Sequence, residues 1–322
     1  MKQQKFLFVD LVSSLFLLVL LIGNFLGLLY ITEGNLVISM LGSMFLVICY
    51  YFVILLLKNN KEVMIRKNFL HPSLLFWVFF LILGYASFNL MSHFINVEFN
   101  CKEKIIAEAT HKIKLVDNLS DTYKSRSTVD IQNFEAQLKT KLTAYKTTKN
   151  IIIRNQLVLE PFRVDASVLN NPDFINVDEV ANAKVNPYRL KIDKNKENIK
   201  QTIELNSKKY QSVFDNWKRL SLMKTYSVLN DYVDQSSKLI KSKILELPLD
   251  KTPITISYKK QLFPLNNPSK LNKLFPPDYT LPLIIIAIVH LFILIPFFSY
   301  KVRGYKNGTS KGGNKRLGTI EL

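Results

Sequence analysis

Charged residues are almost absent from four runs of the chain, and each run is close to the roughly 20 residues that cross a bilayer core as a helix. Three runs follow one another near the start of the chain and the fourth lies near its end, at 11–31, 36–57, 74–90 and 281–300. Apolar runs of this length are typical of transmembrane helices. The pattern therefore predicts an integral membrane protein that is mainly α, with four transmembrane helices.

The spans divide the chain into four parts. Residues 1–91 hold a short start and three spans, residues 92–280 lie between spans three and four, residues 281–300 form the fourth span, and residues 301–322 form a tail. The part between the spans has mixed charge and is long enough for one domain with its own core. We therefore expect a mostly helical extramembrane domain over 92–280.

Proline spacing indicates where this domain can be helical. No proline occurs at 91–160 or at 188–247, whereas prolines mark the segment 161–187 and the end of the domain. Within each proline-free stretch, apolar residues recur every three or four positions. They are Ile105, Ala109, Ile113, Val116, Ile131, Phe134, Leu138, Leu142 and Tyr145 in the first stretch, and Ile199, Ile203, Tyr210, Phe214, Trp217, Leu229, Val233, Ile240 and Ile244 in the second.

Each stretch could be a hairpin of two ordinary helices or a single rod, and we expect hairpins that pack as an antiparallel helical bundle. Ser127 and Asp130 resemble a capping box and predict the start of a second helix in the first stretch. The segment 161–187 is expected to be a long ordered crossover. Alternating apolar residues at 253–258 predict one short strand, which gives the fold minor β content.

Basic residues in the short segments beside the spans predict the orientation of the chain, because Lys and Arg near membrane spans stay on the cytoplasmic side. The turn at 32–35 has none, whereas the start of the chain, the second loop and the tail have Lys2, Lys5, Lys58, Lys61, Arg66, Lys67, Lys301, Arg303, Lys306, Lys311, Lys315 and Arg316. We therefore expect both termini in the cytoplasm. In a bacterium this describes a multi-pass inner-membrane protein with a large periplasmic domain.

The middle domain lacks the residue patterns of common catalytic and nucleotide-binding sites. All ten glycines lie outside 92–280, so glycine-rich phosphate loops and the nucleophile elbows of hydrolases have no counterpart there. His71, His93, His111 and His290 are not spaced as metal ligands. We expect a protein that is not an enzyme, with no catalytic residue and no metal or cofactor site.

His290 is the one ionisable side chain near the centre of a predicted span. Ionisable residues inside a membrane are costly and are functional candidates for that reason. One interpretation is a hydrogen bond to another span, with Asn24, Ser39 or Ser43 as the partner. The alternative interpretation is a role in handling protons.

Small residues in the first two spans predict where these spans pack. Gly23 and Gly27 form a GxxxG motif in the first span, and Ser39 and Ser43 have the same spacing in the second. Small residues at this spacing let helix backbones approach closely. We expect these two spans to pack through these residues, and self-association of the protein through the same face is the alternative.

The tail at 301–322 has five glycines and six basic residues, so we expect it to be flexible until it binds a partner. Basic residues beside a membrane normally contact anionic lipid. The end of the tail also supplies Leu317, Ile320 and Leu322 as a short apolar docking peptide for a cytoplasmic partner. The expected cytoplasmic segments are too short for a kinase or cyclase domain, which excludes a signalling enzyme.

The hairpin of spans at 11–57 and the glycine-rich basic tail at 312–322 belong to a chain with three N-terminal spans, an outer domain and a fourth span. This architecture resembles the TssN-type inner-membrane subunits of the Bacteroidota type VI secretion system. The resemblance implies a non-enzymatic subunit of an envelope-spanning complex that anchors a contractile injection machine. The resemblance assigns no catalytic residue to this chain.

Two functions from different classes are therefore open. The first is a structural scaffold subunit of a secretion-type membrane complex. Such a subunit would contact membrane lipids, other envelope-complex subunits and a cytoplasmic partner, would form an oligomer and would bind no nucleic acid. The second is a sensory or regulatory membrane protein whose periplasmic helical bundle binds a small ligand.

Overall fold

The structure is a computed structural model that describes residues 8–62, 70–299, 303–305 and 319–321. The described residues are mainly α-helical, as predicted, and four of their helices are long and apolar enough to cross a membrane. Contacts divide the chain into two compact units. We call Met1–Lys104 with Phe263–Leu322 the span unit, and Ile105–Leu262 the bundle unit.

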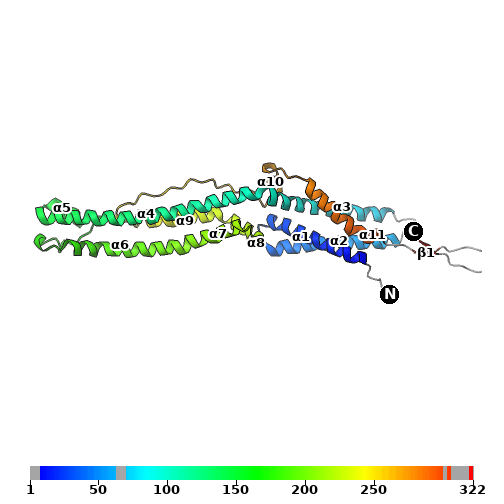
Figure 1. Ribbon diagram of the computed structural model, residues 1–322, viewed down its shortest axis with the longest axis horizontal. Coiled ribbons are helices and arrows are strands. Elements are labelled where there is room, and N and C mark those ends of the chain that lie inside the picture. Colours follow the sequence, from blue (N-terminus) through cyan, green and yellow to red (C-terminus); the bar gives the residue numbers. More distant parts are fainter. Residues whose placement is uncertain (1–7, 63–69, 300–302, 306–318, 322) are drawn as a thin grey trace, which may run out of the picture. The chain divides into compact units, whose positions relative to one another are not determined.

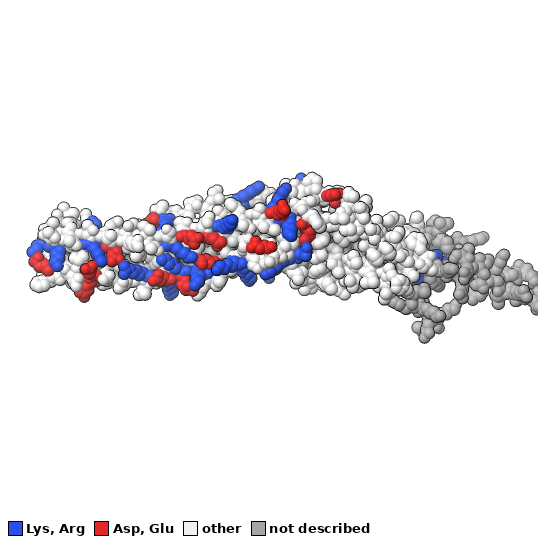
Figure 2. Space-filling view, in the orientation of Figure 1, with Lys and Arg blue, Asp and Glu red and all other residues white. Residues whose placement is uncertain are grey.

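The span unit contains four apolar helices close to the predicted spans: α1 Phe8–Ile31, α2 Leu36–Glu62, α3 Leu70–Ile95 and α11 Thr280–Ser299 (Figure 1). Their outward faces expose large apolar side chains such as Leu15, Phe45, Leu81 and Leu291. On the face shown in Figure 2, acidic and basic side chains gather over the bundle unit, and the surface of the apolar helices is almost free of them. Such a surface suits lipid rather than water.

The third apolar helix does not end where the predicted span ends. Its helical backbone continues from α3 through the π-helical turn η1 Asn96–Cys101 into α4 Lys102–Thr148, a helix of 47 residues. The predicted domain boundary between residues 91 and 92 therefore lies inside a helix. Neither glycine nor proline occurs between Gly84 and Pro161, so neither of these helix-breaking residues interrupts the helix before it ends at Thr148.

Polar side chains hold the returning chain against the span helices within the span unit. Asn96 of η1 donates to the side chain of Asn272 in α10 Pro268–Leu274 at 3.0 Å. Tyr30 of α1 donates to Glu98 of η1 at 2.7 Å. These bonds connect α1, the end of α3 and the segment that precedes α11.

The bundle unit is built from three long helical segments. The first is α4, the second consists of α6 Val177–Ile199, the π-helical turn η3 Lys200–Glu204 and α7 Leu205–Asp215, and the third is α9 Leu229–Ile244. Short helices connect these segments, with α5 Ile151–Val158 and η2 Pro172–Phe174 between α4 and α6, and α8 Arg219–Ser227 between α7 and α9.

Hydrogen bonds between distant residues show the direction of each segment. Bonds between α4 and the second segment join residues whose numbers rise in one and fall in the other, namely Thr110 with Gln211, Ser120 with Glu204 and Glu135 with Arg189. The bonds from the second segment to α9 and to the turn that follows it obey the same rule, namely Ser207 with Tyr232 and Asn195 with Glu246. The second segment is therefore antiparallel to both of its neighbours, as in an antiparallel bundle.

The predicted apolar positions form the interior of the bundle unit. All of them are buried except Tyr210, which is half-buried against the core. Full burial of one large apolar side chain contributes about 1.5 to 3 kcal/mol relative to exposure. The helical period read from the sequence is thus confirmed in both proline-free stretches.

The predicted helix break near Ser127 is wrong, because α4 passes through it as a single rod. Ser127 donates to the Lys124 carbonyl of its own helix at 3.0 Å and caps no new helix. Asp130 accepts from the backbone N–H groups of Leu249 at 3.1 Å and Asp250 at 2.6 Å. Asp130 therefore does not cap a helix. Its carboxylate instead binds the backbone of the chain that leaves α9.

The expected crossover at 161–187 is shorter than predicted, because α6 begins at Val177 and includes Pro187. A proline inside a helix leaves the carbonyl four residues earlier without its usual N–H partner. Ala183 and Pro187 are both exposed, so water can bind this carbonyl. Exposure on the outer face therefore explains why the helix tolerates the proline.

The predicted strand at 253–258 is also wrong as secondary structure. The segment is extended, but no strand pairs with it in the part of the chain that the structure describes (Figure 1). In the tail, β1 Arg303–Tyr305 pairs antiparallel with β2 Thr319–Glu321. The remaining tail residues lie outside the described ranges, so the flexibility of the tail stays a prediction.

The GxxxG motif of α1 packs against α3 rather than against α2. A Cβ atom added at Gly27 would lie 2.4 Å from the Leu90 carbonyl oxygen, and one added at Gly23 would lie 2.2 Å from Met91 Cε. The absence of side chains at both positions thus lets the two helices approach closely. The motif serves packing within the span unit, although its partner differs from the predicted one.

Candidate functional site

One polar side chain from each of the four apolar helices enters a common cluster. Asn24 of α1 donates to Ser87 of α3 at 3.1 Å. Tyr50 of α2 lies 3.3 Å from Ser87 and 2.8 Å from Nε2 of His290 in α11. Asn24, Tyr50 and Ser87 are fully buried. We call these four residues the polar cluster, and it connects all four helices.

The hydrogen positions in the polar cluster follow from His290. Its Nδ1 lies 2.7 Å from the Ile286 carbonyl, which can only accept, so Nδ1 carries the proton of the neutral ring. Nε2 is then an acceptor, and the Tyr50 hydroxyl donates to it. The Tyr50 hydroxyl also donates to Ser87 at 3.3 Å, so Ser87 accepts from both Tyr50 and Asn24. The hydrogen bonds therefore connect Asn24 to His290 through Ser87 and Tyr50.

Aromatic side chains enclose the ring of His290. The ring of Phe80 meets it edge-on with 5.2 Å between ring centroids, and the ring of Tyr50 does so at 5.4 Å. A Cβ atom added at Gly84 would lie 3.2 Å from His290 Nε2. Gly84 thus makes room for the imidazole against α3. A polar group that lost its partner in such surroundings would be destabilising.

The polar cluster shows which of the predicted polar residues meet. His290 pairs with Tyr50, so the expectation of Asn24, Ser39 or Ser43 as its partner is wrong. Asn24 belongs to the same cluster but is three hydrogen bonds away from the ring. Ser39 and Ser43 are buried elsewhere on α2, and each donates to a backbone carbonyl three or four residues earlier in the chain.

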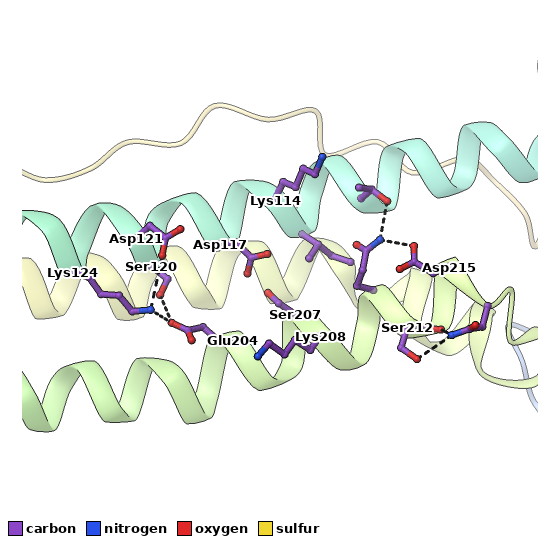
Figure 3. Close-up of a pocket in the computed structure, with 14 residues that line it drawn as sticks. Lys114, Asp117, Ser120, Asp121, Lys124, Glu204, Ser207, Lys208, Ser212 and Asp215 are labelled. Atoms are coloured by element: carbon purple, nitrogen blue, oxygen red, sulfur yellow. Dashed lines mark hydrogen bonds and ion pairs between the residues drawn. The ribbon is translucent and has the colours of Figure 1, made fainter.

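The bundle unit contains a polar groove of about 660 Å³ between α4 and the segment that includes α7 (Figure 3). Its walls carry both charge signs and several hydroxyl and amide groups, from Thr110, Ile113, Lys114, Asp117, Ser120, Asp121, Lys124, Glu204, Ser207, Lys208, Gln211, Ser212, Asp215 and Asn216. Asp117 of α4 and Ser207 of α7 point toward one another across it.

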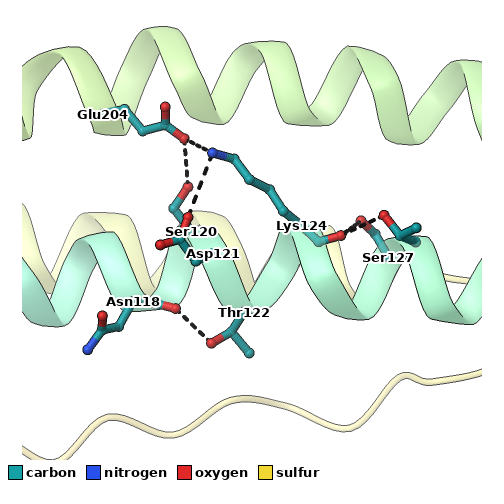
Figure 4. A network of polar contacts seen from close by, with 8 residues as sticks. Asn118, Ser120, Asp121, Thr122, Lys124, Ser127 and Glu204 are labelled. Atoms are coloured by element: carbon teal, nitrogen blue, oxygen red, sulfur yellow. Dashed lines mark hydrogen bonds and ion pairs between the residues drawn. The ribbon is translucent and has the colours of Figure 1, made fainter.

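A network of polar contacts closes one end of this groove (Figure 4). Lys124 forms an ion pair with Glu204, which also accepts from the Ser120 hydroxyl at 3.1 Å. Asp121 lies 3.9 Å from the Lys124 ammonium group. The hydrogen bond from Lys124 is the main cause that holds the pKa of Glu204 below its usual value. Glu204 is therefore ionised at neutral pH, and its contacts join α4 to η3.

Four other charged residues line the groove, and one of them, Asp215, accepts a hydrogen bond from the Gln211 amide at 2.6 Å. Lys114, Asp117 and Lys208 line it but form no ion pair within the described ranges. One carboxylate and two ammonium groups in a groove suit a small ligand that carries both charges. No three or more His, Cys, Asp or Glu side chains of the described residues come together as a metal site.

The end of the bundle where the chain turns from α4 to α6 exposes a group of large apolar side chains. They are Ile151, Ile152, Leu159 and Phe174, which we call the apolar tip. Phe174 is 88% exposed, which is unusual for a phenylalanine in a packed domain. Several exposed apolar side chains from neighbouring segments mark an interaction surface more reliably than scattered single ones.

Hydrogen bonds hold the backbone beneath the apolar tip. Asn150 caps α5 by accepting a backbone N–H at 2.8 Å. Tyr145 of α4 donates to the Leu169 carbonyl at 2.8 Å, and Lys146 donates to the Ile175 carbonyl at 2.9 Å. Both carbonyls belong to the connection between α5 and α6. The apolar tip is therefore a preformed surface.

The predicted docking residues of the tail have no described side-chain environment. Leu317 and Leu322 lie outside the described residues, and Ile320 lies in β2, where only the backbone is described. Docking of the tail therefore stays a prediction.

No protein-family model, curated protein or solved structure matches the chain. The functional argument therefore rests on the geometry of the polar cluster, the groove and the apolar tip. Sequence reasoning found His290 and Asn24 but missed Tyr50 and Ser87. It also missed the apolar tip, although the isoleucine run that directly follows Asn150 was an available signal.

Replacing Ser87 tests the polar cluster. Ser87→Ala should destabilise the span unit by roughly 0.6 to 1.7 kcal/mol per lost hydrogen bond, the range for bonds between membrane helices. The reason is that Asn24 and Tyr50 both lose a partner. Ser92→Ala is the matched control, because the buried Ser92 hydroxyl has no partner among the described residues. Unfolding of the full chain in mixed SDS micelles measures both variants, and equal losses would contradict the role given to Ser87.

Acidification should weaken the bundle unit through Glu204, whose pKa is lowered in the folded chain mainly by Lys124. The stability from this group is complete above the usual glutamate pKa of about 4.3 and is lost as the pH falls through the lower folded value. Glu204→Gln should therefore reduce the fall in the thermal midpoint of the full chain between neutral and acid pH. A fall as large as in the unmodified protein would show that the ion pair with Lys124 is not stabilising.

Proposed function

We propose that the protein is a non-enzymatic scaffold subunit of an envelope-spanning secretion complex, similar in role to the TssN-type subunits of type VI secretion systems. The observation that carries this proposal is the apolar tip. It is a preformed apolar surface on a long helical bundle, and the backbone of this bundle continues as one helix from a candidate span. An exposed surface of this kind suits a protein partner, which would cover it.

The scaffold acts by position rather than by chemistry. The polar cluster keeps the four candidate spans in one arrangement, with membrane lipids around their outward faces. Other envelope-complex subunits bind the apolar tip, and a cytoplasmic partner binds the tail. Oligomers of the protein repeat these contacts around the assembly.

The location that fits this role is a bacterial inner membrane, with both termini in the cytoplasm and the bundle in the periplasm. The basic residues of the start, the second loop and the tail support this orientation, since the turn at 32–35 has none. The bundle then reaches partners in the envelope while the tail stays on the cytoplasmic side.

Cysteine labelling tests the orientation. Cys101 is buried, and burial raises the pKa of its thiol to about 11, so it is a poor target for a thiol reagent. In a Cys49→Ser background, a cysteine at the exposed Asn182 should react with a membrane-impermeant maleimide that has entered the periplasm, and a cysteine at Lys311 should react only after lysis. Labelling of the Lys311 position in intact cells would place the tail outside.

Polar substitutions in the apolar tip test the scaffold role. Phe174→Ser with Ile152→Ser should remove envelope proteins that co-purify with the full chain, because each buried apolar side chain contributes about 1.5 to 3 kcal/mol to binding. Leu190→Ser is the matched control, since Leu190 is also exposed but lies well along α6. All variants should keep the unmodified thermal midpoint.

Deleting 312–322 provides the second arm of this experiment. The truncated chain should stay inserted and should lose only the cytoplasmic partner. The scaffold proposal is wrong if both the tip variant and the truncated chain recover the same partners in unchanged amounts.

The polar groove favours a second candidate, a sensory or regulatory protein whose bundle binds a small ligand. Its volume of about 660 Å³ and its unpaired charges at Lys114, Asp117 and Lys208 suit a zwitterionic molecule. The neighbouring genes separate the two functions. Secretion or envelope genes favour the scaffold, whereas a response regulator or kinase gene favours the sensor.

A further inference from the structure

An extended segment crosses the bundle unit without belonging to a sheet. We call residues 252–260 the strap; it follows α9 and runs beside α4 and α9 (Figure 1). Its side chains alternate between two faces, with Ile254, Ile256 and Tyr258 half-buried against the core and Thr255, Ser257 and Lys259 exposed. This alternation is that of a β-strand with one covered face.

Both ends of the strap are fastened through their carbonyl groups. Arg126 of α4 donates to the Thr252 carbonyl at 2.9 Å, and Asn230 of α9 donates to the Lys260 carbonyl at 2.5 Å. In a strand, carbonyl groups an even number of residues apart point to the same edge. The bundle therefore binds the two ends of the edge formed by the even-numbered residues.

The other edge of the strap has no partner. No backbone–backbone hydrogen bond involves residues 253–262 within the described ranges. The N–H and C=O groups of Thr255, Ser257 and Lys259 form this edge, which we call the open edge. Backbone polar groups require hydrogen-bond partners, and an unpaired strand edge is a template for another strand.

Side-chain contacts fix the strap in its extended form. Tyr258 donates to Asp234 at 2.8 Å and to the Asn230 carbonyl at 3.2 Å. Lys260 forms an ion pair with Asp234 at 2.8 Å. Isoleucine, threonine and tyrosine also favour strands. A second strand could therefore bind without first ordering the strap, and preformed surfaces bind more tightly for this reason.

The charges around the strap are not balanced. Of its acidic neighbours, Asp234 and Asp250 pair with Lys260 and Arg126, and Asp231 lies near Tyr258. Lys251 precedes the strap and Lys259 lies near its end; both are exposed and have no ion-pair partner in the part of the chain that the structure describes. A strand placed along the open edge would meet these two ammonium groups. An acidic strand fits this site best.

We propose that the open edge of the strap is a docking site for an extended acidic segment of another polypeptide, which adds to it as a β-strand. Main-chain hydrogen bonds to Thr255, Ser257 and Lys259 give the affinity, and Lys251 and Lys259 select for acidic side chains. The strap is distinct from the apolar tip and from the polar groove. The proposal therefore goes beyond the scaffold role and does not depend on it.

Peptide binding to the full chain in detergent micelles tests the proposal. The probe is a short fluorescent peptide that alternates valine and glutamate, and its control alternates valine and lysine. We expect fluorescence anisotropy to detect binding of the glutamate peptide only. Thr255→Pro with Ser257→Pro should weaken this binding about tenfold or more, because two backbone donors are lost. Thr255→Ala with Ser257→Ala keeps these donors and should leave binding unchanged.

A charge variant keeps the test valid if the proline variant unfolds. Lys251→Glu with Lys259→Glu changes only exposed side chains and should reverse the preference, so that the lysine peptide binds and the glutamate peptide does not. Thermal midpoints of all variants show whether the fold is retained. Binding that is absent, or that a folded proline variant keeps, would overturn the strand-docking site. An unreversed preference in the charge variant would overturn the acidic specificity.

Discussion

The hydrogen bonds among Asn24, Ser87, Tyr50 and His290 are the interaction on which the arrangement of the apolar helices depends. Lipid tails are as apolar as leucine, so leucine-rich faces give little preference for one helix arrangement over another. A polar group without a partner in hydrocarbon costs several kcal/mol, roughly 2 to 7 in apolar reference media. These four side chains find partners only when all four helices are in register. Gly27 also lies so close to α3 that a larger residue at this position would disturb the same arrangement.

This constraint gives the proposed scaffold its physical basis. In the proposed scaffold, a bound partner would pull on the apolar helices. Helices that could repack would shift under that pull, whereas helices joined by hydrogen bonds have to break these bonds first. The proposed partner-binding features, by contrast, are on the surface. The apolar tip and the strap are held from below by polar contacts, so each presents a fixed shape to a partner.

The sequence predicted the features that depend on the spacing of apolar residues. It did not predict which face of a helix points inward or which distant residues meet in the folded chain. Hydrophobic runs located the four apolar helices, and the three-to-four spacing located the bundle core, since both are local patterns. Nothing local decides whether Tyr50 or the adjacent Tyr51 faces the interior, so the partner of His290 could not be named. Ser127 and Asp130 have the chemistry of a helix cap, and only the folded structure shows that Asp130 binds the chain after α9. The strap was recognised as extended, but its packing on helices instead of strands is a tertiary property.

The most direct test of the central claim is a double-mutant cycle on the span unit. Unfolding free energies of Tyr50→Phe, His290→Phe and the double variant should give a coupling energy of about 0.6 to 1.7 kcal/mol, because the two side chains share one part-buried hydrogen bond. The same cycle with Tyr51→Phe in place of Tyr50→Phe should be additive, since Tyr51 is exposed. Additivity in the Tyr50 cycle, within about 0.3 kcal/mol, would contradict the claim that the polar cluster sets the arrangement of the four helices.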